Sequence, residues 1–214
     1  MKSSKYIYLI ILIIILTSFI AGIFLASRVP TRMASHWNAQ GFVDGYISKT
    51  WGLFLMPLFS FGILILFWFI PKIDPLKKNV EKFRKYFDLF ILLLILYLAY
   101  IHALSLAWNL NVRFNMNIMI VPAMAILFIF ISILLKHAKR NWFIGIRTPW
   151  TLSSDKVWDK THSLGSRLFI VCGIMCLLGL IWPDLLVWFI LLPILASTLW
   201  LTIYSYLEFN KSRH

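Results

Sequence analysis

The 214-residue sequence has few charged residues, and acidic residues are the scarcest of them. Charged residues make up 14% of the chain, with 8 Asp and Glu against 21 Lys and Arg, whereas 61% of the residues are hydrophobic. A soluble domain carries roughly 25% charged and 45–50% apolar residues, so this chain lacks the polar groups that would cover its surface. The composition therefore excludes an ordinary soluble globular protein.

Cysteine is also scarce, and linker sequences are missing. The two cysteines, Cys172 and Cys176, are four residues apart within an apolar stretch and have no neighbouring histidines. We interpret them as packing residues and expect no disulfide framework, no metal site and no cofactor. The chain has no internal repeat and no Gly/Ser-rich linker. We therefore expect one membrane domain overall.

Six long apolar stretches account for the hydrophobic residues. Each is close to the roughly 20 residues that a helix needs to cross ~30 Å of hydrocarbon, and continuous apolar runs without alternation exclude a β-barrel. We therefore predict an all-α, polytopic membrane protein with six transmembrane helices. The first stretch is longer than the apolar core of a signal peptide, which favours a retained anchor. The predicted spans are 6–26, 51–70, 86–108, 117–135, 168–182 and 185–207.

The basic residues are distributed unevenly between the connecting segments. Seventeen of the 21 Lys and Arg lie in the two terminal segments and in 72–85 and 136–167, and four lie in the alternate segments. Short loops rich in Lys and Arg stay in the cytoplasm, so we predict that both termini are cytoplasmic. This orientation, with attraction to anionic lipid, explains the net charge of +13 without direct nucleic-acid binding.

The third predicted helix carries polar residues on one face. At 100° per residue, Asp88, His102 and Asn109 lie within roughly 80° of one another. A charged group that faces lipid costs at least ~2.5–3.5 kcal/mol, so this face should look into the bundle or into a wet cavity. Two interpretations stay open: a proton or ligand path in a small-molecule or peptide transporter, or an interfacial Asp88 near Arg84 with a hydrogen-bonded, neutral His102.

The predicted outer loop, residues 31–49, contains turn signals and interfacial aromatic residues. Glycine accepts positive φ and Asp bonds its own following backbone, so we expect an ordered loop on the membrane surface. His36 and Asp44 alone are too few for a zinc site, which needs three or four ligands. We predict a partner contact there. Its candidate residues are His36, Trp37, Asn38, Gly41, Asp44 and Gly45.

The second predicted cytoplasmic loop, residues 136–167, contains helix-start signals. Pro149 keeps its predecessor extended, and Ser153 or Ser154 followed by Asp155 is typical of a helix N-cap. Apolar residues then recur at i, i+4, i+7 and i+11, which predicts an amphipathic helix on the cytoplasmic surface before the fifth span. The candidate lipid- or partner-contact residues are Asn141, Gly145, Arg147, Thr148, Pro149, Trp150, Trp158 and His162.

The same loop contains residue types used in catalysis. His162 and Asp159 lie three residues apart and could form a base and its orienting carboxylate, with a nearby Ser or Thr as nucleophile. The sequence has no Gly-rich phosphate cradle and no nucleophile elbow. We therefore predict no catalytic residues and a protein that is not an enzyme. An envelope enzyme acting on lipid or phosphate groups stays an alternative.

Both loops carry family resemblances. The run MASHWNAQG (33–41), with DGY (44–46) and SK (48–49), resembles an uncharacterised N-terminal domain that often occurs on bacterial membrane proteins. The run IDPLKKN (73–79) and the long stretch 141–165, with GIRTPWTL at 145–152, resemble the SdpI family. These matches predict an N-terminal two-helix unit over residues 1–70 and an SdpI-like four-helix unit over residues 71–214.

The SdpI resemblance implies a multi-pass immunity protein of the cell membrane. Such a protein protects its cell from a secreted, membrane-active killing peptide. In the best-known member, the toxin-engaged protein also holds a small winged-helix autorepressor at the membrane, which is a signalling role. The resemblance thus implies three kinds of partner: membrane lipids, a secreted toxin peptide and a small repressor.

Overall fold

The computed structural model describes the backbone of residues 2–212 and the side chains of residues 4–212. Arg213 and the side chain of Lys2, both counted among the basic residues above, lie outside the described part. Six of the described helices are long and apolar enough to cross a membrane, which confirms the predicted number of spans. The fifth lies over Asp155–Leu178 and not over 168–182, because its helix begins earlier and ends before the turn at 179–182. In chain order the elements are α1 (Lys2–Leu25), β1 (Arg32–Trp37), β2 (Val43–Ser48), α2 (Lys49–Ile73), α3 (Lys77–Lys82), α4 (Arg84–Asn109), α5 (Met116–His137), α6 (Pro149–Ser153), α7 (Asp155–Leu178), η1 (Pro183–Leu185) and α8 (Leu186–Lys211).

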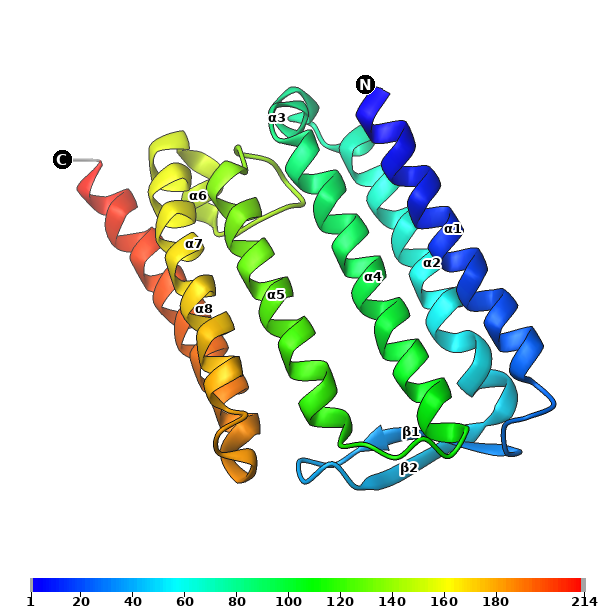
Figure 1. The fold of residues 1–214 in the computed structure, drawn as a ribbon. Helices are drawn as coiled ribbons and strands as arrows, with labels where there is room; N and C mark the ends of the chain where they lie inside the picture. Colours follow the sequence, from blue (N-terminus) through cyan, green and yellow to red (C-terminus); the bar gives the residue numbers. More distant parts are fainter. Residues whose placement is uncertain (1, 213–214) are drawn as a thin grey trace.

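The long helices run alongside one another in two groups (Figure 1). Helices α1, α2 and α4 pack together, α7 packs between α5 and α8, and α4 contacts α5. In the first group, Ile91 and Ile95 of α4 are completely buried in a cluster with Ile11, Ile15 and Leu64. Many large apolar side chains of α1, α2 and α8 are exposed on the outside of the bundle. A surface of this kind is suited to lipid rather than to water.

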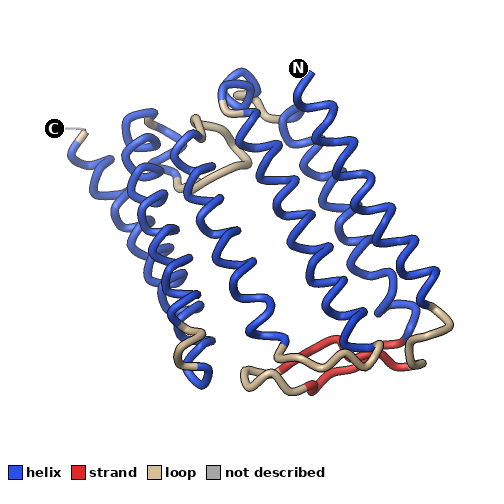
Figure 2. Tube along the Cα trace, viewed as in Figure 1, coloured by secondary structure: helices blue, strands red, loops and turns tan. Residues whose placement is uncertain are grey.

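The two ends of the bundle differ in structure (Figure 2). One end, which we call the hairpin end, carries the two strands, the α4–α5 connection and η1. The other end, which we call the terminal end, carries both chain termini, α3, α6 and the segment that joins α5 to α6. All the polar connections of the chain are therefore gathered at these two ends.

The loop expected to be ordered forms an antiparallel hairpin. Arg32 pairs with Ser48 and Trp37 with Val43, with irregular register around His36. The Asn38 side chain shapes the turn, because its Oδ1 accepts hydrogen bonds from the backbone N–H groups of residues 40 and 42 at 3.1 and 2.9 Å. Gly41 completes the turn with a φ of 83°. The order of this loop was predicted from its sequence, but its strands were not.

The stretch expected to lie on the membrane surface as a separate helix is instead the start of α7. Thr148 caps the short α6 with Pro149 in its first turn, and Ser154 then caps α7, whose helix continues without a break into the fifth span. The apolar stripe includes Val157 and Thr161, which are 1% and 0% exposed. It packs against α5, α6 and α8. The stripe is therefore covered by protein rather than by lipid.

Candidate functional site

The hairpin is attached to α4 through Asn109. The Asn109 Oδ1 accepts a hydrogen bond from the Ala34 N–H at 2.8 Å, and its Nδ2 donates to the Ala34 carbonyl at 3.1 Å. Both residues are buried. Met33 packs beside them against Gly52 of α2, where an added Cβ would lie 2.6 Å from the Met33 sulfur. The first strand is thus fixed to two helices of the first group.

The tip of the hairpin reaches across to α5. The Asn117 Nδ2 donates hydrogen bonds to the carbonyl oxygens of Asn38 at 3.1 Å and Ala39 at 2.9 Å. A Cβ on Gly41 would lie 2.8 Å from the amide of Asn115, the residue whose side chain caps α5. The hairpin therefore connects the two helix groups at this end of the bundle.

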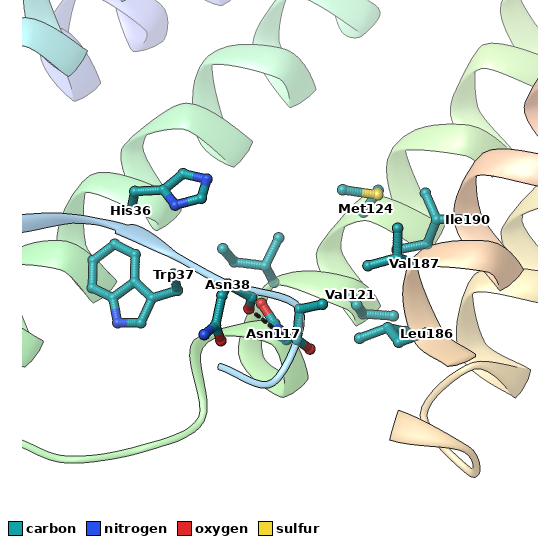
Figure 3. Close-up of a pocket in the computed structure, with 11 residues that line it drawn as sticks. His36, Trp37, Asn38, Asn117, Val121, Met124, Leu186, Val187 and Ile190 are labelled. Atoms are coloured by element: carbon teal, nitrogen blue, oxygen red, sulfur yellow. Dashed lines mark hydrogen bonds between the residues drawn. The ribbon is translucent and has the colours of Figure 1, made fainter. Parts of the chain in front are cut away.

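A groove lies between the hairpin tip and helices α5 and α8 (Figure 3). It has a volume of about 300 Å³, and a smaller pocket of about 80 Å³ adjoins it through shared lining residues. The hairpin contributes one wall and the two helices contribute an apolar opposite wall. The residues of that opposite wall are Asn117, Ile120, Val121, Met124, Leu186, Val187 and Ile190.

The structure divides the predicted outer-loop residues into two sets. His36, Trp37 and Asn38 line the groove, whereas the other three shape the hairpin. Gly45 leaves room for His36, because a Cβ on Gly45 would lie 2.8 Å from the His36 Cβ. The exposed Asp44 carboxylate pairs with the His36 ring across the strands. The α5 and α8 residues of the groove carry no motif, so sequence reasoning did not identify them.

At the terminal end, the segment between α5 and α6 is folded around Asn141. Its Oδ1 accepts hydrogen bonds from the N–H groups of Phe143 at 2.9 Å and Ile144 at 2.6 Å. Its Nδ2 donates to the carbonyls of Lys139 at 2.8 Å and Ile144 at 2.9 Å. Asn141 is completely buried. It stabilises a turn and presents nothing to a partner.

His162 fixes the same segment to α7. Its Nε2 accepts a hydrogen bond from the Ile146 N–H at 3.0 Å, so its Nδ1 carries the proton and donates to the Trp158 carbonyl at 2.9 Å. The ring also stacks on Trp158, with centroids 3.9 Å apart. Gly145 has a φ of 111°, and a Cβ there would lie 2.4 Å from the His162 Nε2. The chain therefore approaches the imidazole at a point where only glycine fits.

Several residues expected to contact lipid or a partner are instead internal. Trp158 is completely buried, and its Nε1 donates to the Ala138 carbonyl at 2.9 Å. Thr148 is hydrogen-bonded to Ser205 of α8 at 3.0 Å, and Trp150 packs edge-on against Tyr206. Pro149 occupies the first turn of α6 and, unlike these residues, is exposed. Trp is common at membrane interfaces, which misled the prediction for Trp158. Trp158 and His162 instead form the internal support of the loop.

Arg147 differs from Thr148, Trp158 and His162 because its side chain is exposed. Its Nη1 donates to the Trp142 carbonyl at 3.0 Å, and no carboxylate pairs with it in the described part of the chain. Within the predicted terminal-end set, Arg147 is thus the cation that remains available to a partner.

The two segments that carry the SdpI resemblance contact each other. The Asp74 Oδ2, in the connection after α2, accepts a hydrogen bond from the Trp142 N–H at 2.9 Å. The Asn79 Nδ2 of α3 donates to the Arg140 carbonyl at 2.9 Å. Asp74 is 2% exposed, so this contact is internal. Both segments were recognised from the sequence, but their contact was not predicted.

The base and orienting carboxylate considered for an enzyme are not assembled. Both ring nitrogens of His162 are bonded to backbone groups, and Asp159 pairs on the surface with Lys139 at 3.3 Å. Within the described side chains, no group of three or more His, Cys, Asp and Glu residues could hold a metal ion. His162 and Asp159 therefore do not form a base and its orienting carboxylate.

The polar face of α4 does not line a common path. Asp88 is completely buried and accepts hydrogen bonds from Ser4 at 2.7 Å, Tyr8 at 3.3 Å and Arg84 at 2.6 Å. Asn109 holds the hairpin. His102 alone lines a cavity, of about 280 Å³, whose other walls are apolar or small side chains of α1 and α4. The three residues thus have three separate environments.

Two family models match the chain, and each match includes one of the structural features described above. Residues 137–205 match the model of the SdpI/YfhL protein family, and residues 13–61 match a domain of unknown function, DUF1648. The resemblance to the SdpI family is confirmed. The DUF1648 match includes the hairpin, and the SdpI match extends from the end of α5 into α8.

A curated relative extends this similarity along the chain. The sequence is 25% identical over 204 residues to "Immunity protein SdpI" of Bacillus subtilis (strain 168), an alignment that covers 95% of this chain and 96% of that protein. No solved structure matches the chain. With its six candidate spans, the chain is a multi-pass membrane protein.

Proposed function

We propose that this chain is an integral membrane immunity protein that protects its cell from a secreted killing peptide. The observation that carries the proposal is the alignment with Immunity protein SdpI over nearly the full length of both chains. Most basic residues belong to the terminal-end segments, so both termini are assigned to the cytoplasm. The hairpin end then faces the outside, from which a secreted peptide arrives. The proposed role is binding, without catalysis.

The groove at the hairpin end supplies a surface suited to such a peptide. Its helix wall is mostly apolar, and His36 and Asn38 lie on the hairpin wall. A membrane-active peptide has apolar side chains that would otherwise be in lipid, and contact with an apolar groove of fixed shape gives them a specific alternative. The peptide would thus be held where the hairpin connects the two helix groups.

Filling the groove tests this proposal. We expect Val187→Trp to abolish protection, because the larger ring occupies the space between α8 and the hairpin tip. Protection is measured as survival of a sensitive bacterium that expresses the chain and is exposed to the killing peptide secreted by the source organism. Wild-type chain should restore growth. The matched control is Leu195→Trp, at an α8 position that is 61% exposed outside the groove. Equal survival of the two variants at equal membrane levels would exclude the groove.

The terminal end is assigned the second function that the family implies, capture of a small winged-helix repressor. This surface is basic, lies in the cytoplasm under the proposed orientation and presents the exposed Arg147. The internal hydrogen bonds of Asn141 and His162 hold the segment that carries Arg147 in one conformation. A fixed loop loses less conformational entropy when a partner binds.

We expect Arg147→Ala to weaken repressor capture by at least about tenfold, since exposed arginines often dominate interface energies. Its side chain is outside the buried core of the loop, so peptide tolerance should be unchanged. The measurement is the membrane-bound fraction of a fluorescently tagged repressor in cells exposed to the peptide. Lys156→Ala, another exposed cation on this end, is the control. Normal capture by the Arg147 variant would remove this residue from the repressor contact.

A further inference from the structure

A second pocket lies at the terminal end, between α5 and α7. It has a volume of about 410 Å³, and three basic side chains line it: Lys136 and His137 from the last turn of α5, and Arg167 from α7. The Ser163 hydroxyl is also part of its lining. None of these residues belongs to the hairpin groove or supports the Arg147 loop.

The charges of this pocket are not neutralised within the described part of the chain. Three other cations of the same loop and helix have carboxylate partners. Lys139 pairs with Asp159 at 3.3 Å and Arg140 with Asp155 at 2.7 Å. Lys160 pairs with Glu208. Among residues 4–212, no carboxylate forms an ion pair with Lys136 or Arg167. Two cations that share a pocket without a counter-charge attract an anion.

The histidine and two further serines give the pocket fixed walls. The His137 ring stacks on Tyr86 of α4, with centroids 3.7 Å apart, and its Nδ1 bonds the Ile133 carbonyl at 2.8 Å. Ser132 and Ser166 are buried and hydrogen-bonded to each other at 3.0 Å, which joins α5 to α7 at this level. The site is therefore held by contacts that do not require a ligand.

The pocket also has an apolar side that is exposed on the outside of the bundle. Ile133 and Ile170 belong to its lining and are 37% and 41% exposed. Both lie within candidate membrane spans, α5 and α7. A free inorganic anion gains no favourable contact with apolar side chains. A lipid, by contrast, places its phosphate among the cations and its acyl chains along the apolar residues.

We propose that this pocket binds the phosphate of an anionic phospholipid from the leaflet at the terminal end. Lys136 and Arg167 bind the phosphate oxygens, Ser163 donates a hydrogen bond to them, and the acyl chains run along Ile133 and Ile170. The lipid would stabilise the α5–α7 contact at the point where the SdpI-family segment begins. The proposal does not depend on the peptide or the repressor.

The test measures lipid binding to the purified full-length chain in a neutral detergent. The probes are a short-chain phosphatidylglycerol, the matching phosphatidylcholine and inorganic phosphate, and the readouts are native mass spectrometry and the shift of melting temperature. We expect preferential binding of phosphatidylglycerol. Lys136→Gln/Arg167→Gln should bind it about 30-fold more weakly, since each basic residue near an anionic surface contributes about 1 kcal/mol.

Two further variants make the result decisive. Lys78→Gln/Lys156→Gln removes the same charge from exposed positions at the same end, outside the pocket, and should bind phosphatidylglycerol as the wild type does. Ser163→Glu adds a carboxylate to the pocket at an exposed position and should weaken binding without removing a cation. Equal binding of the two lipids, or equal losses in both double variants, would overturn the proposal. Binding of inorganic phosphate as strong as that of phosphatidylglycerol would overturn the lipid assignment.

Discussion

Gly145→Ala is expected to destabilise the terminal end by about 3 kcal/mol. A non-glycine residue at positive φ costs roughly 1–2 kcal/mol, and the new Cβ would lie 2.4 Å from the His162 Nε2. The imidazole must move, so the part-buried Ile146 N–H loses its acceptor, which costs a further ~1 kcal/mol, at the lower end of the range for a buried donor. The measurement is the free energy of unfolding of the detergent-solubilised chain by denaturant titration.

The chain offers a matched control for this substitution and a way to isolate its cause. Gly62→Ala lies within α2, where nothing is within 4 Å of the added Cβ, so it should be neutral or stabilising by up to ~1 kcal/mol. In a His162→Ala background the clash disappears, and Gly145→Ala should then cost only its backbone strain. An equal cost in both backgrounds would show that the contact with the imidazole is not the cause.

The spans could be predicted because their signal is local. Each apolar stretch must satisfy its own backbone hydrogen bonds in lipid, so length and composition decide that it is a helix. The cap of α7 is local too, and the N-cap predicted at Ser153 or Ser154 is found at Ser154. The environment of that helix could not be predicted locally. Whether its apolar stripe contacts lipid or protein depends on where α5 and α8 lie.

The groove and the loop contacts depend on residues far apart in the sequence. Asn109 and Ala34 are 75 residues apart, and Asp74 meets the Trp142 N–H across 68 residues. Asn109 was assigned to the polar face of its helix, but nothing in the sequence indicated that it binds a strand. His36, Trp37 and Asn38 could be selected from the loop itself, whereas Val187 and Ile190 were indistinguishable from other apolar residues of α8.

Asn109→Leu is expected to release the hairpin from α4 and to abolish protection. The leucine removes both hydrogen bonds to Ala34. The backbone N–H and C=O of Ala34 are then buried without partners. Each unsatisfied group costs roughly 1–3 kcal/mol, so the attached state loses about 2–6 kcal/mol. Hydrogen exchange should accelerate over residues 32–48, while the amides of α4, which keep their helical bonds, should exchange as in the wild type.

A control variant at the hairpin tip distinguishes loss of the attachment to α4 from a general disturbance of the loop. Gln40→Ala changes an exposed side chain at the tip and leaves the Asn109 and Asn117 contacts in place, so both exchange and survival under the killing peptide should match the wild type. The groove wall formed by His36, Trp37 and Asn38 requires the strand to stay on α4. If Asn109→Leu accelerates exchange yet preserves survival, peptide recognition does not use the groove. If it changes neither, the Met33 packing and the Asn117 contacts suffice to hold the hairpin, and the Asn109 contact is not required for its attachment.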